Sequence, residues 1–249
     1  DAISKGLGAA TKLTLPLTVG LGFGIKAASD FEGAMAEIQA RAGLTSKELD
    51  TVSKFALKMG ADTVFSGKEA ADAMLELMAS GQNVNEAMST LKPVLDLAAA
   101  GSIGLGEAAD GVTDIMSQFG LATKDAAAVS DILAQAAGAS SADVAGLIQG
   151  FANVGPVAKL FGMSVTDTAG ALAVLAENGI KGAEAGTALK SMLTNMSRDT
   201  KDVVGTWNRL GISMFDAKGN TRDMVAVLGD LRAALADKSE EEKIKIIQT

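Results

Sequence analysis

The sequence contains no histidine, no cysteine and no tyrosine among its 249 residues. It therefore lacks the usual general base near neutral pH, the thiolate nucleophile and the commonest zinc ligands. Carboxylate-only and Ser–Lys mechanisms would need a positioned set of side chains, and no motif in the sequence supplies one. We predict that the chain is not an enzyme and that it binds no cofactor and no metal. Without cysteine, no disulfide framework indicates a redox compartment.

Aromatic residues and positive charge are also scarce. Aromatic side chains make up 4% of the sequence, the net charge is −8 and the pI is about 4.7. Binding to duplex DNA depends on basic side chains that neutralise phosphates, and binding to single strands depends on aromatic stacking. We therefore predict no specific nucleic-acid binding, so that DNA close to this protein slides past it.

Long apolar runs are absent except for one uncharged stretch at residues 13–25. A membrane-spanning helix needs about 20 apolar residues, and this stretch is shorter and interrupted by proline and glycine. It also lacks the pattern of a secretory signal. Two interpretations stay open: a strip that packs in the core or against other copies, and a segment that enters or lies on a membrane. The candidate contact residues are Leu15, Leu17, Val19, Leu21, Phe23 and Ile25.

The sequence does contain regularly spaced residues that are typical of helix starts and helix ends. Thr45 with Glu48, Ser66 with Glu69, and Ser239 with Glu242 have the spacing of capping boxes. Further predicted starts are at Asn85, Thr123, Ser141, Thr166 and Thr221. Predicted glycine stops are at Gly60, Gly81, Gly101, Gly120, Gly138, Gly179 and Gly211. Between these marks, apolar residues recur every three to four positions, which predicts an all-α array of short helices in hairpins.

A weak internal repeat supports the hairpins. The sequence Glu-Ala-Ala-Asp occurs at residues 69–72 and again at 107–110, and Asp143 follows in a similar position, which gives spacings of 36 to 38 residues. That spacing is the length of one helical hairpin. We expect the period to end after Asp143, because the next similar block begins at Asp167, only 24 residues later. The pattern therefore favours stacked hairpins and leaves a regular solenoid open.

A few features interrupt the helical pattern. Pro93 is expected to kink its helix or to remove a hydrogen bond from the first turn. Residues 212–221 predict a small strand-like turn, and Trp207 and Phe215 beside it are predicted core anchors. The predicted division is an apolar, glycine-rich segment 1–30, a helical-hairpin core 31–211, and residues 212–249 with the turn and C-terminal helices. We expect the whole to be a fragment of a longer chain.

Several blocks together resemble the core region of tail tape measure proteins from long-tailed phages and prophages. The blocks are Leu15-Pro16, Asp30–Met35, Met59–Ser66, Met78–Gly81, Leu97–Gly101, Gly179–Gly182, Ala185–Leu189, Leu210–Ile212 and Asp216–Asn220. Each block alone is weak evidence. Their order and spacing over residues 13–249 carry the resemblance.

The resemblance implies a structural protein of the virion that fills the lumen of the tail or its tip. Such a protein sets tail length during assembly and leaves the tube ahead of the DNA at ejection. The implied partners are copies of itself in a homo-oligomer, tail tube and tail tip proteins, and the host membrane during infection. An alternative function is a membrane-inserting module that helps to form a passage for DNA through the host envelope. The family core provides no catalytic residues.

The frequent helix ends in this sequence bear on how such a protein measures length. A single helical rod of 249 residues would extend roughly 370 Å, at 1.5 Å per residue. Glycine and proline interrupt this sequence too often for a rod. We therefore predict a compact or hairpin-stacked module that contributes little length, a terminal or inter-copy module and not the measuring part.

Overall fold

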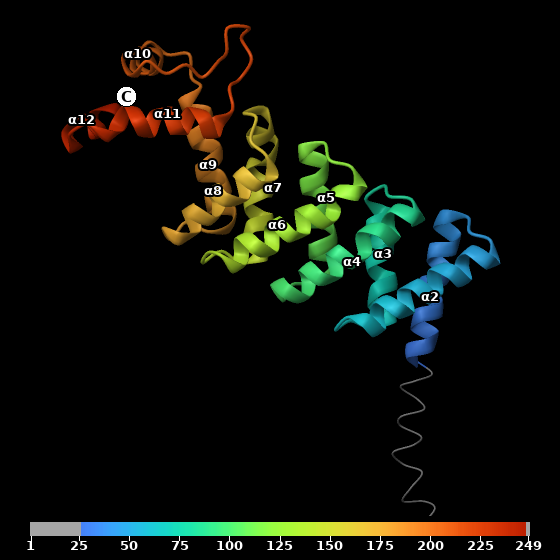
Figure 1. Cartoon of the computed structure of the whole chain (residues 1–249). Coiled ribbons are helices and arrows are strands. Elements are labelled where there is room, and N and C mark those ends of the chain that lie inside the picture. The colour runs from blue at the N-terminus through green and yellow to red at the C-terminus, as the bar shows by residue number, and fades with distance from the viewer. Residues whose placement is uncertain (1–25, 248–249) are drawn as a thin grey trace, which may run out of the picture. The chain divides into compact units, whose positions relative to one another are not determined.

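The computed structural model describes residues 26–247, and the regular structure in that range is helical apart from one β-bridge (Figure 1). The predicted all-α fold is confirmed. Residues 26–42 are helical. The next elements are α2 (Ser46–Asp62), α3 (Gly67–Ala79), α4 (Val84–Gly101), α5 (Leu105–Phe119), η1 (Thr123–Asp125) and α6 (Ala126–Gly138). The remaining elements are α7 (Val144–Leu160), α8 (Val165–Glu177), α9 (Gly182–Met196), α10 (Lys201–Leu210), α11 (Met224–Ala236) and α12 (Glu240–Ile247). The bridge joins Phe215 and Thr221, where the sequence predicts a strand-like turn.

The chain divides into two compact units, one ending at Leu95 and the other beginning at Asp96. The boundary falls within α4, which continues through the predicted kink at Pro93. In the first unit, α2 packs on α3, and Met59 of α2 and Met74 and Leu77 of α3 are buried. The division predicted at residues 30 and 211 remains a prediction.

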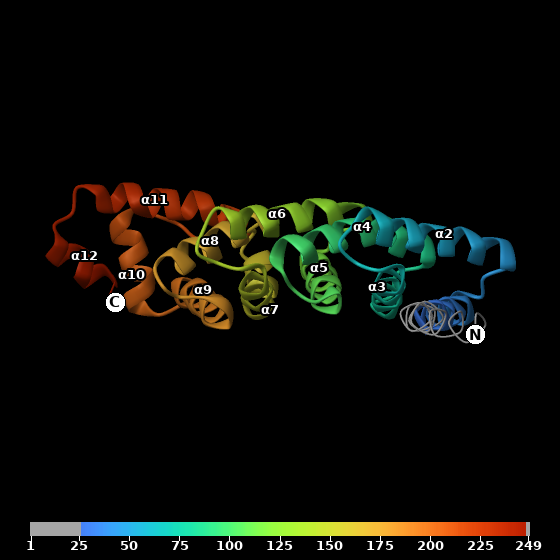
Figure 2. The same cartoon turned by 90° about the horizontal axis from the view of Figure 1, so that it is seen from below.

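The second unit is built from two layers of helices. Helices α5, α7 and α9 lie side by side in one layer, and α6 and α8 lie side by side in the other (Figure 2). Consecutive helices from α5 to α9 also contact each other, so the hairpins in this range pack both within themselves and against their neighbours. The core between the layers is made of fully buried side chains, among them Ile115, Leu133, Leu147, Phe151 and Leu172.

The hairpin repeat is more regular than the sequence indicates. Helices α3, α5, α7 and α9 begin at residues 67, 105, 144 and 182, which are 38, 39 and 38 residues apart. The expectation that the period ends after Asp143 is therefore wrong. Asp167 lies on α8, the second helix of its hairpin, whereas Asp143 caps α7, the first helix of the same hairpin. The two short motifs look alike because both begin a helix, not because they occupy the same place in the repeat.

The three predicted capping boxes are confirmed, because Thr45, Ser66 and Ser239 each exchange hydrogen bonds with the glutamate three residues later. Other helix starts lie a few residues from their predicted positions. Side chains of Asn83, Asp143, Ser164 and Asp223 cap α4, α7, α8 and α11, so the starts predicted at Asn85, Ser141, Thr166 and Thr221 are wrong. Thr123 begins the short η1 segment ahead of α6. Where several capping residue types lie close together, only the backbone geometry decides which one caps.

Most predicted glycine stops are confirmed. Gly81, Gly120, Gly179 and Gly211 follow helices with positive φ, a conformation that costs little only for glycine. Gly101 and Gly138 are the last residues of α4 and α6. Gly60 is an exception: it lies inside α2, two residues before the end of the helix. A Cβ there would lie 2.8 Å from the Cα of Gly67 on α3, so this glycine permits a close approach of two helices.

The capping box at Ser66 predicts that the stability of the first unit depends on pH. Glu69 Oε2 accepts hydrogen bonds from the Ser66 backbone N–H at 2.7 Å and from its hydroxyl at 2.8 Å, which hold the Glu69 pKa below the ordinary value of 4.5. The stabilisation that the Glu69 carboxylate provides is therefore complete above pH 4.5, and it is lost as pH falls through the pKa of Glu69 in the folded protein. We expect Glu69→Gln, which keeps a capping group, to flatten the dependence of Tm on pH between 7 and 3.

Replacing the cap itself provides the control for this effect. Ser66→Ala is expected to lower the unfolding free energy by about 1 kcal/mol at neutral pH, because the N–H of Glu69 loses its acceptor. If the Tm of the wild type and of Glu69→Gln fell in parallel on acidification, the Glu69 carboxylate would not contribute to acid sensitivity.

Candidate functional site

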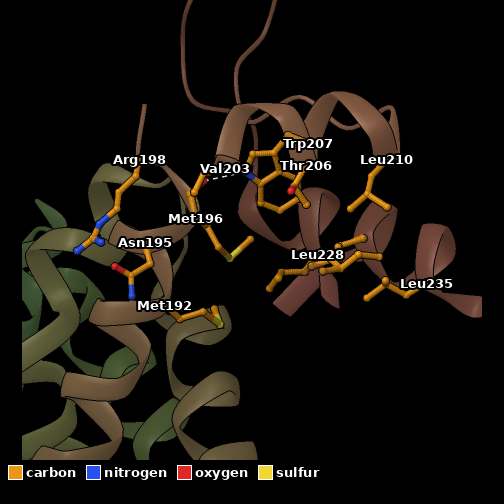
Figure 3. A pocket seen from close by; sticks show the side chains of 12 residues that line it. Met192, Asn195, Met196, Arg198, Val203, Thr206, Trp207, Leu210, Leu228 and Leu235 are labelled. Atoms are coloured by element: carbon orange, nitrogen blue, oxygen red, sulfur yellow. Dashed lines mark hydrogen bonds between the residues drawn. The ribbon is translucent and has the colours of Figure 1, made fainter. Parts of the chain in front are cut away.

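An apolar cavity of about 680 Å³ opens among the last helices of the second unit (Figure 3). Helices α9, α10, α11 and α12 all contribute to it. We call it the C-terminal cleft, and its lining consists of Met192, Asn195, Met196, Arg198, Val203, Thr206, Trp207, Leu210, Leu228, Leu231, Leu235 and Ile246. Figure 3 shows Met192 and Met196 on one side and Leu228 and Leu235 on the other, with Trp207 between and above them.

Local sequence sets the positions of α10 and α11 around the C-terminal cleft. The Thr200 hydroxyl caps α10 by accepting from the Val203 N–H at 3.3 Å, and Gly211 ends the helix with a φ of 70°. The loop that follows is held by Arg222, which donates to the Ser213 carbonyl and to the Asp230 carboxylate, each at 2.8 Å. Asp223 then caps α11.

The large apolar side chains of the C-terminal cleft are only half-buried, unlike those of the core between the two layers. Met196, Val203, Trp207, Leu210, Leu228, Leu231, Leu235 and Ile246 are all partly exposed. Side chains of this size stabilise a protein most when they are fully removed from water, at about 25 cal/mol per Å². The cleft therefore retains apolar surface whose burial would stabilise a further contact.

The two predicted core anchors have different environments. Trp207 lines the C-terminal cleft, and its indole N–H donates to the Met196 carbonyl at 2.8 Å, which joins α10 to the end of α9. Phe215 is 47% exposed on the loop, so the prediction that it anchors the core is wrong. Its backbone pairs with Thr221, and its ring lies at the surface of the loop that this bridge closes.

Few polar groups of the C-terminal cleft remain available for chemistry. The Trp207 N–H is taken by Met196, and the Thr206 hydroxyl accepts a hydrogen bond from Arg209 Nη2 at 2.8 Å. Asn195 and Arg198 are the other polar side chains in the lining, and both are exposed. This arrangement suits apolar contact with a charged edge and presents no nucleophile–base pair.

Carboxylates elsewhere hold the fold together. Glu177 Oε1 accepts from the Ser141 N–H at 2.5 Å, and Glu241 pairs with Lys245. The Asp216 carboxylate accepts from the side chain and the backbone of Asn220 at 3.0 and 2.9 Å, and these bonds lower the Asp216 pKa. Residues 216–221, within the turn predicted at 212–221, thus form a closed polar loop. Across residues 26–247 no cluster of three or more potential metal-ligating acids is present.

Comparison with known proteins places the chain in a family. A family described as phage-related minor tail protein matches residues 53–249. The chain belongs to this family. It is also 35% identical, over 244 residues, to the tape measure protein of Pneumococcus phage Dp-1, a match that covers 98% of this chain and 21% of that protein. No solved structure matches the chain.

A second relative extends the comparison. The chain is 28% identical over 207 residues to the probable tape measure protein of Escherichia phage P2, which covers 82% of this chain and 25% of that protein. The predicted resemblance to a phage tail tape measure protein is confirmed. This minor tail protein chain has a structural role in a phage tail, and it spans about a fifth to a quarter of the length of these two relatives.

The candidate contact residues predicted from sequence, Leu15, Leu17, Val19, Leu21, Phe23 and Ile25, lie outside the described residues. Their assignment to inter-copy or membrane contact stays a prediction. Among residues 26–247 of this minor tail protein, no helix has both the length and the apolar character needed to cross a membrane.

The sequence contained a partial signal for the C-terminal cleft. Leu228, Leu231 and Leu235 recur at helical spacing, and Trp207 is the single tryptophan of the chain. Periodicity predicts which face of α11 is apolar. It does not predict that the neighbouring helices leave this face partly uncovered, because the gap depends on how α9, α10 and α12 pack together.

Proposed function

We propose that the chain is a helical module of a tape measure protein that occupies the lumen of the phage tail. In this proposal the complete protein sets tail length during assembly and leaves the tube ahead of the DNA at ejection. The module itself acts by packing with copies of itself and with tail tube and tail tip proteins, without catalysis. The similarity to two tape measure proteins and the stacked-hairpin architecture support this function.

The stacked hairpins are the observation that supports the part proposed for the module in length control. As a single rod, a 38-residue repeat would extend about 57 Å at 1.5 Å per residue. In the second unit, first helices of successive hairpins pack directly on each other, and packed helices are about 8–10 Å apart. Each repeat therefore advances the array by about one sixth of the length of a rod. The module supplies packing surface and adds little to the length that the complete protein measures.

The charge of the chain suits a protein that must precede DNA through a tube. Its net charge is −8, and residues 96–189 carry ten acidic and only three basic side chains. A surface of that sign does not neutralise phosphates, so it does not retain the genome by counterion release. The negative charge therefore supports a protein that passes alongside DNA and does not bind it.

The test is to delete one repeat in the phage genome that encodes the chain. Removing residues 144–181 takes out α7 and α8 and leaves Asp143 to cap α9. We expect fewer completed tails, because the layers of the second unit lose a central hairpin. The tails that form should shorten by about 10 Å or less, against about 57 Å for a rod of 38 residues. Tail lengths are measured by electron microscopy of several hundred particles.

A duplication of the same residues is the matched control, since a packing module should tolerate it with an equally small change of length. A change of tail length proportional to the residues removed or added would contradict the proposed role of the module. Normal tails that lack the chain altogether, shown by mass spectrometry of purified virions, would contradict the assignment to the tail.

A further inference from the structure

We propose that α6 is a moving part of the second unit, which detaches from the neighbouring helices and returns while those helices stay folded. Local openings of this kind differ in free energy along a protein, and the elements with the weakest packing open first. Release of α6 exposes apolar side chains between the two layers of the unit without unfolding it. This motion goes beyond the proposed function, which assigns no conformational change to any one helix.

The start of α6 is less well fixed than the start of α8, which lies beside it in the same layer (Figure 2). Both helices have 13 residues. Helix α8 begins with a capping box, in which Ser164 and Asp167 exchange hydrogen bonds. Helix α6 begins without a side-chain cap, and the Asp125 carboxylate accepts instead from the Ala122 N–H at 2.9 Å. The first turn of α6 therefore lacks the acceptor that a capping side chain supplies.

The side chains that fix α6 in the core are few. The large apolar side chains that it buries are Val129 and Leu133, whereas α5 and α7 each bury four. Six of its 13 residues are alanine, a residue that favours the helical conformation but contributes little buried area. The segment therefore tends to be helical by itself and is held only weakly by its neighbours.

A buried hydroxyl weakens the packing of α6 further. One buried serine or threonine occurs on each of α6, α8 and α10. Thr168 on α8 donates to the Ser164 carbonyl at 2.8 Å, and Thr206 on α10 accepts from Arg209. Ser130 on α6 is 4% exposed, and among the described residues its hydroxyl has no hydrogen-bond partner. A hydroxyl that loses water without gaining a partner opposes folding, so opening of α6 is favoured by the return of the Ser130 hydroxyl to water.

The segments on both sides of α6 confine its motion. Before it, Gly120 follows α5 with a φ of 67°, and the nearby Gln118 side-chain oxygen is also buried without a partner among the described residues. After it, Ser141 is held against the next hairpin, because its N–H donates to Glu177 Oε1 and its carbonyl accepts from Lys181 Nζ, each at 2.5 Å. The chain therefore bends at residues 120–125 and 138–140, while Ser141 keeps α7 and α8 in place.

Native-state hydrogen exchange with mass spectrometry measures the opening of each helix. In the wild type without denaturant, we expect the amides of α6 to exchange on the order of tenfold or more faster than those of α5, α7 and α9. Molecules with α6 open are a small fraction of the total, so urea unfolding of the whole unit remains a single transition.

Replacement of the buried hydroxyl tests the cause of the opening. We expect Ser130→Ala to slow exchange of the α6 amides by roughly tenfold and to leave exchange in α7 and α9 unchanged. Because alanine also raises helix propensity, Ala128→Ser makes the reverse change at an exposed position of the same helix and should speed exchange by only about twofold. Thr168→Val removes a hydroxyl that has a partner, so it should not slow exchange in α8.

Three outcomes would overturn the proposal. Exchange in α6 as slow as in α5 and α7 would mean that α6 does not open separately. Unchanged or faster exchange in Ser130→Ala would show that the Ser130 hydroxyl does not weaken α6. Equal slowing in all helices of the second unit would show that α6 opens only when the whole unit unfolds. Circular dichroism at 222 nm confirms that each variant is folded, and each outcome is independent of whether the chain is found in tails.

Discussion

Replacing Gly186 by alanine is expected to lower the unfolding free energy of the second unit by about 3 kcal/mol or more. A Cβ at this position would lie 2.9 Å from the Cα of Gly150 and closer still to the Gly150 carbonyl oxygen. Both atoms belong to the backbone of α7, so no side-chain rotation relieves the clash. Helices α7 and α9 would have to move apart, and they form the most extensive helix pair in the described part of the chain.

Thermal unfolding followed at 222 nm measures this effect, and a loss of that size corresponds to a fall in Tm of roughly 6–12 °C. Gly170→Ala is the matched control, because Gly170 lies on the exposed face of α8 and a Cβ there meets nothing within 4 Å. Removing a glycine from a helix interior should stabilise that helix by about 0.5–1 kcal/mol. Equal Tm values for the two variants would show that α7 and α9 are not in close contact.

The close contact of α7 and α9 shows where prediction from the sequence reaches its limit. Gly146 and Gly150 on α7 face Gly182 and Gly186 on α9, two pairs each spaced four residues apart. In the sequence a glycine marks either the end of a helix or a close approach, and only tertiary packing distinguishes them. The stop predicted at Gly60 failed for this reason, whereas Gly120 and Gly211 are left-handed stops.

The fold class and the helix starts marked by capping boxes were accessible because they depend on local chemistry. When glutamate follows serine by three residues, each side chain accepts a hydrogen bond from the other residue's backbone N–H, which has no partner within the helix. Ser66 and Glu69 do this at the start of α3. The C-terminal cleft depends instead on how four helices pack, and the apolar pattern of α11 is the same whether its face is covered or open. The regular period was hidden for a related reason: Asp143 and Asp167 look alike as helix-start residues although they belong to different helices of one hairpin.

Phe151→Ala is expected to lower the unfolding free energy by about 3–5 kcal/mol. Phe151 on α7 is fully buried, and its ring meets the edge of Phe119 on α5 with centroids 5.9 Å apart and planes at 73°. The alanine leaves a cavity between two neighbouring hairpins and removes an edge-to-face pair worth about 0.5–1.5 kcal/mol. Phe215→Ala makes the same chemical change at a ring that is 47% exposed, and it should cost less than about 1 kcal/mol.

Urea unfolding of the two phenylalanine variants also tests whether the hairpins of the second unit fold together. In a stacked array each repeat is stabilised mainly by its neighbours, so weakening one interface either lowers the stability of the whole array or separates it into parts. Because α7 also packs on α8 and α9, we expect Phe151→Ala to unfold in one transition at lower urea with an unchanged m-value. Two transitions, or a reduced m-value, would mean that hairpins on either side of Phe151 unfold separately. A single transition would show that the second unit is one cooperative body, as a module that works by packing requires.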